Sequence, residues 1–115
     1  IAFRLWDAEQ PWQGERADVV IAVEVIEHVA DAALAVKNLI AAATREVWIS
    51  TPNGRGKPRP PNNPSHVREY EPREVLEMVG ALGIRTTIQV LNWEDFAPVS
   101  PDTTEISPLV YRIVL

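Results

Sequence analysis

Residues 17–53, with the sequence ADVVIAVEVIEHVADAALAVKNLIAAATREVWISTPN, decide the expected fold. Residues 19–23 form a short, continuous apolar run rich in β-branched side chains, which suits a strand covered on both faces, as in a parallel sheet. A helical pattern follows, and residues 46–50 give a second short strand. Two strands joined by a helix predict a right-handed βαβ unit, and therefore an α/β fold.

Polar side chains appear where each of these two strands ends. EVIEH (residues 24–28) follows the first strand, and STPN (residues 50–53) closes the second. Ligands of open α/β sheets bind outside the carboxyl ends of the strands. The sequence therefore predicts a binding or catalytic site at this edge of the sheet.

The bulk properties indicate a single domain over residues 1–115. The chain has a mass of 12.8 kDa and is 46% hydrophobic, which fits one folded domain with a real core. It has no cysteine, so neither a disulfide framework nor a thiolate metal site is expected. No apolar run approaches the roughly 20 residues of a membrane span. We therefore expect a cytoplasmic protein with no membrane partner.

The charge is acidic overall but unevenly distributed. A net charge of −5 argues against broad nucleic-acid binding, which usually needs a basic face. Residues 54–68 nevertheless contain four basic side chains and no acid: Arg55, Lys57, Arg59 and Arg68. This proline-rich stretch is either a solvated loop or a loop that receives an anionic substrate.

Local signals place the remaining elements. Alternating apolar residues predict a short strand over Ile1–Leu5. Asp31 is suited to cap a helix that runs to about Ala43, and Pro72 fits the first turn of another helix. The last two strands, near residues 84–90 and 109–115, are joined by a loop and predict an antiparallel hairpin at one sheet edge, with the final strand buried between neighbours.

The ordered set of motifs resembles a known family. DAE (7–9), DVVIAVEVIEHV (18–29), STPN and NPSHVREYEPREVLEMV (63–79) follow one another as in class I S-adenosylmethionine-dependent methyltransferases, most closely the small-molecule and glycan group with the ubiquinone-type O-methyltransferases. The resemblance implies a Rossmann-like sheet, mostly parallel with an antiparallel edge. Ile1–Leu5 would correspond to the third strand of that family, and Asp18–Val23 to the fourth.

The Gly-rich loop that cradles the methionine part of the cofactor in this family has no counterpart here. Gly54-Arg55-Gly56 is not a substitute, because no helix opens after it. The resemblance therefore implies that the first two strands are missing and that the fourth has a bare edge. We expect a partial methyltransferase domain that is completed by a missing N-terminal half or a partner chain, or else a non-catalytic subunit.

The resemblance also assigns roles to individual residues. Asp7 would accept a hydrogen bond from the adenine amino group of S-adenosylmethionine, while the Ala8 N–H meets a ring nitrogen. Glu24 and Val25 would line the cofactor pocket. His28 has the pKa range of a general base for a hydroxyl acceptor; alternatively, Glu27 and His28 only shape the start of the helix.

His66 is the second catalytic candidate. With Glu24, Glu27 and His28 it makes a set of two carboxylates and two imidazoles that resembles the metal site of small-RNA ribose 2′-O-methyltransferases. Alternatively, His66 and Glu69 only bracket the entrance to a helix. The acceptor, contacted by Asn53, Arg68 or Tyr70, is expected to be a small molecule or glycan methylated on oxygen or nitrogen, with RNA as the alternative.

Overall fold

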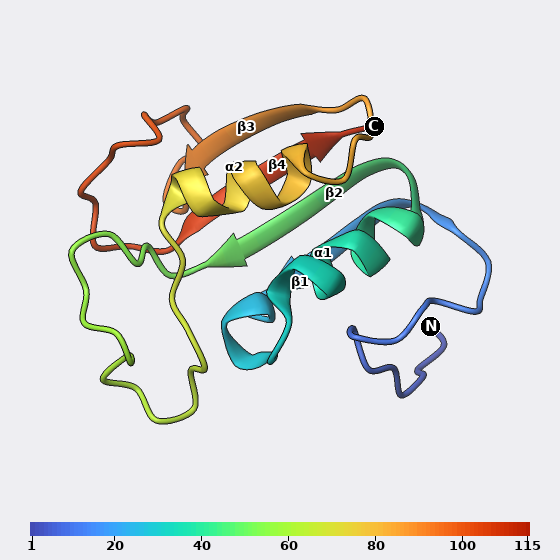
Figure 1. Ribbon diagram of the computed structural model, residues 1–115. Coiled ribbons are helices and arrows are strands. Elements are labelled where there is room, and N and C mark those ends of the chain that lie inside the picture. Colours follow the sequence, from blue (N-terminus) through green and yellow to red (C-terminus); the bar gives the residue numbers. More distant parts are fainter.

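The computed structural model describes residues 1–115 and contains one four-stranded sheet with two helices (Figure 1). Its elements are, in order: β1 (Ala17–Val23), the 3₁₀ helix η1 (Ile26–His28), α1 (Ala32–Ala41), β2 (Ala43–Thr51), α2 (Pro72–Gly80), β3 (Thr87–Asn92) and β4 (Leu109–Val114). The predicted βαβ unit and the α/β class are confirmed.

The sheet has the strand order β1-β2-β4-β3. β1 and β2 are parallel, and β4 is antiparallel to both β2 and β3. The prediction of a mostly parallel sheet is therefore wrong, because the return of β4 between β2 and β3 makes two of the three neighbouring pairs antiparallel. The predicted antiparallel edge hairpin, with the last strand between neighbours, is confirmed.

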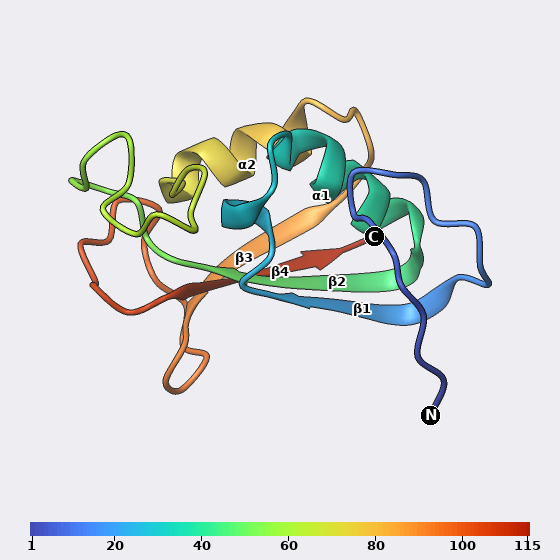
Figure 2. The same ribbon diagram turned by 90° about the horizontal axis from the view of Figure 1, so that it is seen from below.

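Both helices lie on one face of the sheet (Figure 2). On this face the strands bury a ladder of side chains that includes Val47, Ile49, Tyr111 and Ile113, all 0% exposed. α1 begins where the Asp31 carboxylate accepts a hydrogen bond from the Leu34 N–H at 3.0 Å, as predicted. This covered face is the core of the molecule.

The opposite face of the sheet carries no helix (Figure 2). On β1, Val19, Ile21 and Val23 point to this face and are 46%, 68% and 55% exposed. The prediction that β1 is covered on both faces is therefore wrong for this chain. β1 is also an edge strand, since only β2 pairs with it.

The N-terminal segment is not a strand, contrary to the prediction for Ile1–Leu5. Ile1, Phe3 and Leu5 are at least 92% exposed. An alternating pattern becomes a strand only where another strand supplies hydrogen-bond partners, and none lies beside this segment. The N-terminal segment contacts α1 at Ala8, whose carbonyl accepts a hydrogen bond from the Asn38 side chain at 2.9 Å.

None of the helices is both long and apolar enough to cross a membrane.

Candidate functional site

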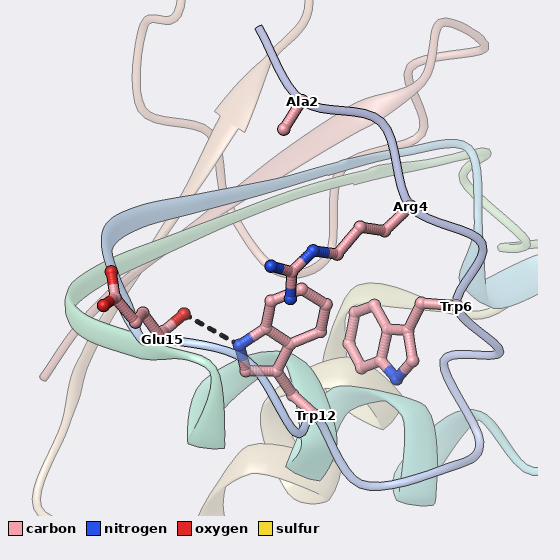
Figure 3. A pocket seen from close by; sticks show the side chains of 5 residues that line it. All are labelled: Ala2, Arg4, Trp6, Trp12 and Glu15. Atoms are coloured by element: carbon pink, nitrogen blue, oxygen red, sulfur yellow. Dashed lines mark hydrogen bonds between the residues drawn. The ribbon is translucent and has the colours of Figure 1, made fainter.

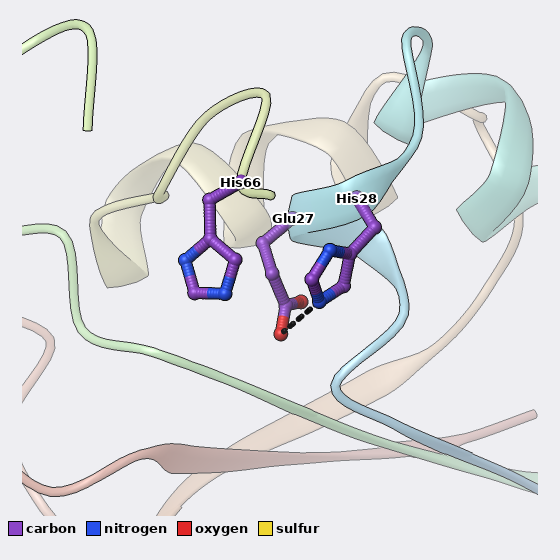
Figure 4. Close-up of side chains that lie close together, drawn as sticks. All are labelled: Glu27, His28 and His66. Atoms are coloured by element: carbon purple, nitrogen blue, oxygen red, sulfur yellow. Dashed lines mark ion pairs between the residues drawn. The ribbon is translucent and has the colours of Figure 1, made fainter. Parts of the chain in front are cut away.

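A cluster of ionisable side chains lies beside the carboxyl ends of β1 and β2. Glu24 directly follows β1 and adopts a positive φ of 51°, which turns the chain sharply out of the sheet. The single turn of η1 then presents Glu27 and His28. His66, from the long loop between β2 and α2, points toward the same carboxylate (Figure 4).

Glu27 is the centre of this cluster. Its side chain is completely buried, and its Oε2 accepts a hydrogen bond from the Thr51 hydroxyl at 2.9 Å. Its Oε1 has no hydrogen-bond partner and lies 3.9 Å from His28 Nε2. A buried carboxylate oxygen without a donor is costly. The neighbouring carboxyl group of Glu24 can supply one, because a hydrogen bond to Glu27 is among the causes of its raised pKa.

Each imidazole is held through its Nδ1 atom. His28 Nδ1 lies 2.8 Å from the Ser65 carbonyl oxygen, and His66 Nδ1 lies 2.9 Å from Glu69 Oε1. A carbonyl or carboxylate oxygen can only accept, so both rings donate from Nδ1. In the neutral form, both rings therefore carry the lone pair on Nε2. The rings meet edge to face, with their centroids 4.7 Å apart.

The loop that carries His66 is anchored to the same cluster. The Val67 N–H donates to the Glu27 carbonyl at 2.7 Å, and the Gly54 N–H donates to the Tyr70 carbonyl at 2.9 Å. A Cβ on Gly54 would lie 2.6 Å from the backbone of Glu69. The absence of a side chain at Gly54 thus lets the two ends of the loop, at Gly54 and at Glu69–Tyr70, lie against each other.

The carboxylates of the cluster have opposite pKa shifts. Burial, reinforced by the carboxyl group of Glu27, raises the pKa of Glu24 to about 8. Burial also opposes ionisation of Glu69, but hydrogen bonds from His66 and Lys57 outweigh it and hold the pKa of Glu69 below its usual value. Lys57 Nζ lies 3.1 Å from Glu69 Oε2. The site therefore combines an ionised Glu69 with a Glu24 that keeps its proton at neutral pH.

The residues predicted to bind the cofactor lie on two separate segments. Asp7 Oδ1 accepts from the Glu9 N–H at 2.9 Å, and the Ala8 N–H makes no hydrogen bond within the chain. Glu24 and Val25 lie at the end of β1, and no hydrogen bond or ion pair joins them to Asp7 or Ala8. A free N–H beside an exposed carboxylate fits an adenine edge, but the binding roles of all these residues stay predictions.

Other predicted contact residues have structural partners. The Asn53 side chain donates to the carbonyls of Thr103 and Glu105, and Arg68 pairs with Glu74 at 2.7 Å. All four basic residues of the loop are engaged in ion pairs within the chain: Arg55 with Asp102, Lys57 with Glu69, and Arg59 and Arg68 with Glu74. The solvated-loop interpretation of this stretch has the better support.

Sequence reasoning missed the groups that orient the site. Thr51 stands in the STPN motif, so a hydroxyl at a strand end could have drawn attention to it. Ser65 contributes only its backbone carbonyl, which every residue has, and Lys57 reaches the site through Glu69. Neither of these two roles has a sequence signal.

The largest cavity lies elsewhere. It measures about 640 Å³ and is formed by the N-terminal segment, where Trp6 and Trp12 meet edge to face with their ring centroids 5.2 Å apart (Figure 3). Its charged residues, Arg4 and Glu15, are exposed, and it contains no cluster of ionisable groups. We therefore place the candidate site at Glu27 rather than in this cavity.

No protein-family model matches the sequence, and no curated protein matches it. The structure is similar to magnesium protoporphyrin IX methyltransferase from Synechocystis PCC 6803. The structure of that enzyme with bound S-adenosylmethionine gives a TM-score of 0.54 at 18% identity, over 95% of this chain and 43% of that one. The structure with S-adenosylhomocysteine gives 0.54 at 16% identity, over 95% and 48%.

The chain thus spans less than half the length of the structures it matches. At this identity the likeness shows a shared fold: an α/β fold with a four-stranded mixed sheet, as found within a methyltransferase of this type.

Proposed function

We propose that the chain is part of a methyltransferase that uses S-adenosylmethionine and methylates an oxygen or nitrogen of a small molecule or glycan. The observation that carries the proposal is the fold shared with structures that hold S-adenosylmethionine or S-adenosylhomocysteine. The position of the Glu27 cluster supports it, because ligands of such sheets bind at the carboxyl ends of the strands.

In this proposal the two segments of predicted cofactor residues have separate tasks. Asp7 and Ala8 bind the adenine edge, with the carboxylate as acceptor and the free N–H as donor. Glu24 and Val25 line the pocket nearer the acceptor. S-adenosylmethionine supplies an electrophilic methyl group, so the chain mainly has to align the acceptor for in-line displacement.

His28 is the proposed general base. Because its Nδ1 donates to the Ser65 carbonyl, its Nε2 lone pair is free to take a proton from an acceptor hydroxyl. His28 is also the more accessible ring, with 41% of its side chain exposed against 13% for His66. His66 is the second candidate for the general base; it lies beside the same Glu27 carboxylate but is less exposed to solvent than His28.

A complete cofactor site would need more polypeptide than this chain supplies. The free edge of β1, continuous with the exposed side chains of Val19 and Ile21, is suited to receive it, because an unpaired edge offers hydrogen-bonding groups to another strand. The source is a missing N-terminal half or a partner chain. A non-catalytic, methyltransferase-like subunit is the alternative from a different functional class.

An RNA acceptor has less support than a small molecule or glycan. The net charge is −5, and every basic side chain of the Arg55–Arg68 loop already pairs with a carboxylate of this chain, although Arg59 and Arg68 share one carboxylate, that of Glu74. Phosphate binding relies on lysine and arginine side chains, and in this loop an incoming phosphate would have to compete with carboxylates of the same chain.

Titration with S-adenosylhomocysteine tests the proposal. Amide signals of Ala8 and Val25 should shift, and Asp7→Asn should weaken binding by about tenfold, the effect of losing about 1.4 kcal/mol from one hydrogen bond to a charged group. Asp18→Asn, at the exposed amino end of β1, is the matched control. Signals that do not move at millimolar ligand, both in this chain alone and in the longer protein or complex that completes it, would contradict the cofactor role and favour the non-catalytic subunit.

A further inference from the structure

We propose that the loop between β2 and α2 forms a binding site for an uncharged, hydroxyl-rich ligand of about monosaccharide size, and that this ligand is the methyl acceptor. The binding site depends on the loop alone, whereas the role of its ligand as acceptor rests on the proposed methyl transfer. Among the acceptors considered above, the site selects a sugar over an aromatic small molecule.

A polar cavity of about 330 Å³ lies within this loop, which leaves the end of β2 and returns to the start of α2 (Figure 1). Its volume is at the lower end of the range of about 300–1,000 Å³ that is usual for small-molecule sites. Most such sites are lined mainly by hydrophobic and aromatic side chains. This cavity has neither an aromatic ring nor a branched aliphatic side chain, since its walls are Lys57, Pro58, Pro61, Asn62, Asn63 and Glu69.

The walls of the cavity offer both hydrogen-bond donors and acceptors. The Asn62 side chain is exposed and makes no hydrogen bond within the chain, so its amide presents two N–H groups and one carbonyl oxygen. Lys57 Nζ lies 3.1 Å from Glu69 Oε2, which leaves two ammonium N–H groups and further carboxylate lone pairs unused. A hydroxyl group both donates and accepts, so a ligand with several hydroxyl groups matches this mixed set.

The charges of the walls favour an uncharged ligand. The one cationic wall residue, Lys57, and the one anionic wall residue, Glu69, are paired with each other. An anionic ligand would be repelled by the Glu69 carboxylate, and a cationic ligand would be repelled by the Lys57 ammonium group. A neutral polar ligand meets neither cost.

Pro58 and Pro61 add compact, rigid apolar surfaces to the same cavity. A sugar ring carries hydroxyl groups around its rim and C–H groups on its faces, so it can bind the polar walls while one face packs against a proline ring. The φ angle of proline is fixed, so these walls lose little conformational entropy when a ligand binds. An aromatic acceptor would find no ring to stack on and would leave polar wall groups without partners.

Two wall residues also contact His66 and so join the cavity to the proposed catalytic imidazoles. Glu69 Oε1 accepts from His66 Nδ1 at 2.9 Å, and Asn63 Nδ2 lies 3.4 Å from His66 Nε2. The His28 and His66 rings meet edge to face, with their centroids 4.7 Å apart. Because a sugar carries hydroxyl groups on several sides, some can bind the loop while another reaches Nε2 of His28, the proposed base.

Titration with the methyl glycosides of glucose, galactose and mannose, followed by NMR, tests the site. At least one glycoside should shift the side-chain amide signals of Asn62 and Asn63, with a Kd of about 1–10 mM. Hydroquinone and inorganic phosphate are the aromatic and the anionic probe, and neither should shift these signals at the same concentration. The titration is made with this chain and with the longer protein or complex that completes it.

Variants of the walls locate the binding. Asn62→Ala should weaken glycoside binding by about fivefold, the effect of losing one neutral hydrogen bond, and it removes no contact within the chain. Lys57→Met should weaken it by at least tenfold, because a hydrogen bond from a charged donor is stronger. Gln13→Ala, which removes an exposed amide from the N-terminal segment, is the matched control and should leave the affinity unchanged.

Three results would overturn the sugar site: no shift of the Asn62 and Asn63 signals with any glycoside, larger shifts with hydroquinone or phosphate, or unchanged affinity in both wall variants. S-adenosylhomocysteine tests the enzyme separately. Shifts of Ala8 and Val25 with that ligand, but none with the glycosides, would keep the methyltransferase and reject the sugar acceptor. Glycoside shifts without shifts of Ala8 and Val25 would confirm the sugar site and reject its role in methyl transfer.

Discussion

The two faces of the sheet carry similar side chains in very different surroundings. On the helix-covered face Ala22, Ile49 and Ile113 are at most 4% exposed, whereas on the other face Ile21 is 68% exposed. β1 is apolar on both sides, yet only one side is covered in this chain. The amino-acid composition of a strand therefore indicates which of its faces can be buried. The elements that pack against the strand decide which face is in fact buried.

The strongest test of this comparison is to shorten one isoleucine on each face. Ile113→Ala should lower the free energy of unfolding by about 3–4 kcal/mol, because it removes fully buried carbons and leaves a cavity. Ile21→Ala should cost less than about 1 kcal/mol, since that side chain is already mostly in water. Urea unfolding measures both. Equal losses would mean that the open face is covered in solution.

A smaller effect should come from the carboxyl end of β1, where the chain turns toward the covered face. Because the pKa of Glu24 is raised from 4.5 to about 8, the folded chain holds this proton more tightly than the unfolded chain does. Stability from this group is complete below pH 4.5 and is lost as the pH rises through about 8. Glu24→Gln should flatten this decline and stabilise the chain at pH 9 by about 1–2 kcal/mol, less than the full shift because Glu24 is partly exposed.

The measurement is urea unfolding from pH 5 to pH 9 with a chelator present, so that bound metal does not contribute. Glu77→Gln on α2 is the control and should leave the slope unchanged. A parallel decline in Glu24→Gln and the unaltered chain would assign the pH dependence to other groups.

The smallest effect on stability should accompany a change on the open face. Ile21→Thr keeps a β-branched residue in the strand and should alter the free energy of unfolding by no more than about 0.5 kcal/mol. It should nevertheless reduce the fluorescence of a dye that binds exposed apolar surface, because Ile21 lines an apolar groove with Trp48 and Phe96. Unchanged dye fluorescence would show that the dye does not bind in this groove.

Much of the local structure could be predicted because its causes lie within a few residues. The Asp31 cap, the start of α2 at Pro72 and the strand at Val19–Val23 follow from capping, proline chemistry and β-branched composition. EVIEH marked the site for a similar reason: polar residues directly after an apolar strand must lie at its carboxyl end. The prediction of His28 and His66 as a pair came from the family resemblance, and the structure places the two rings together.

The failures concern features that depend on distant parts of the chain. The pattern at Ile1–Leu5 permits a strand, but no neighbouring strand is there to pair with it.

By itself, the sequence determined the βαβ unit, the starts of both helices and the polar cluster after β1, because short-range propensities and hydrophobic periodicity act along the chain. It did not fix the end of the first helix, which was expected near Ala43 but lies at Ala41, because β2 begins at Ala43. Only the tertiary structure decided that β4 inserts between β2 and β3, that one face of β1 stays open, and that Ser65 and Glu69 turn both imidazoles toward Glu27. These outcomes depend on contacts between residues far apart in sequence, whose geometry no local pattern encodes.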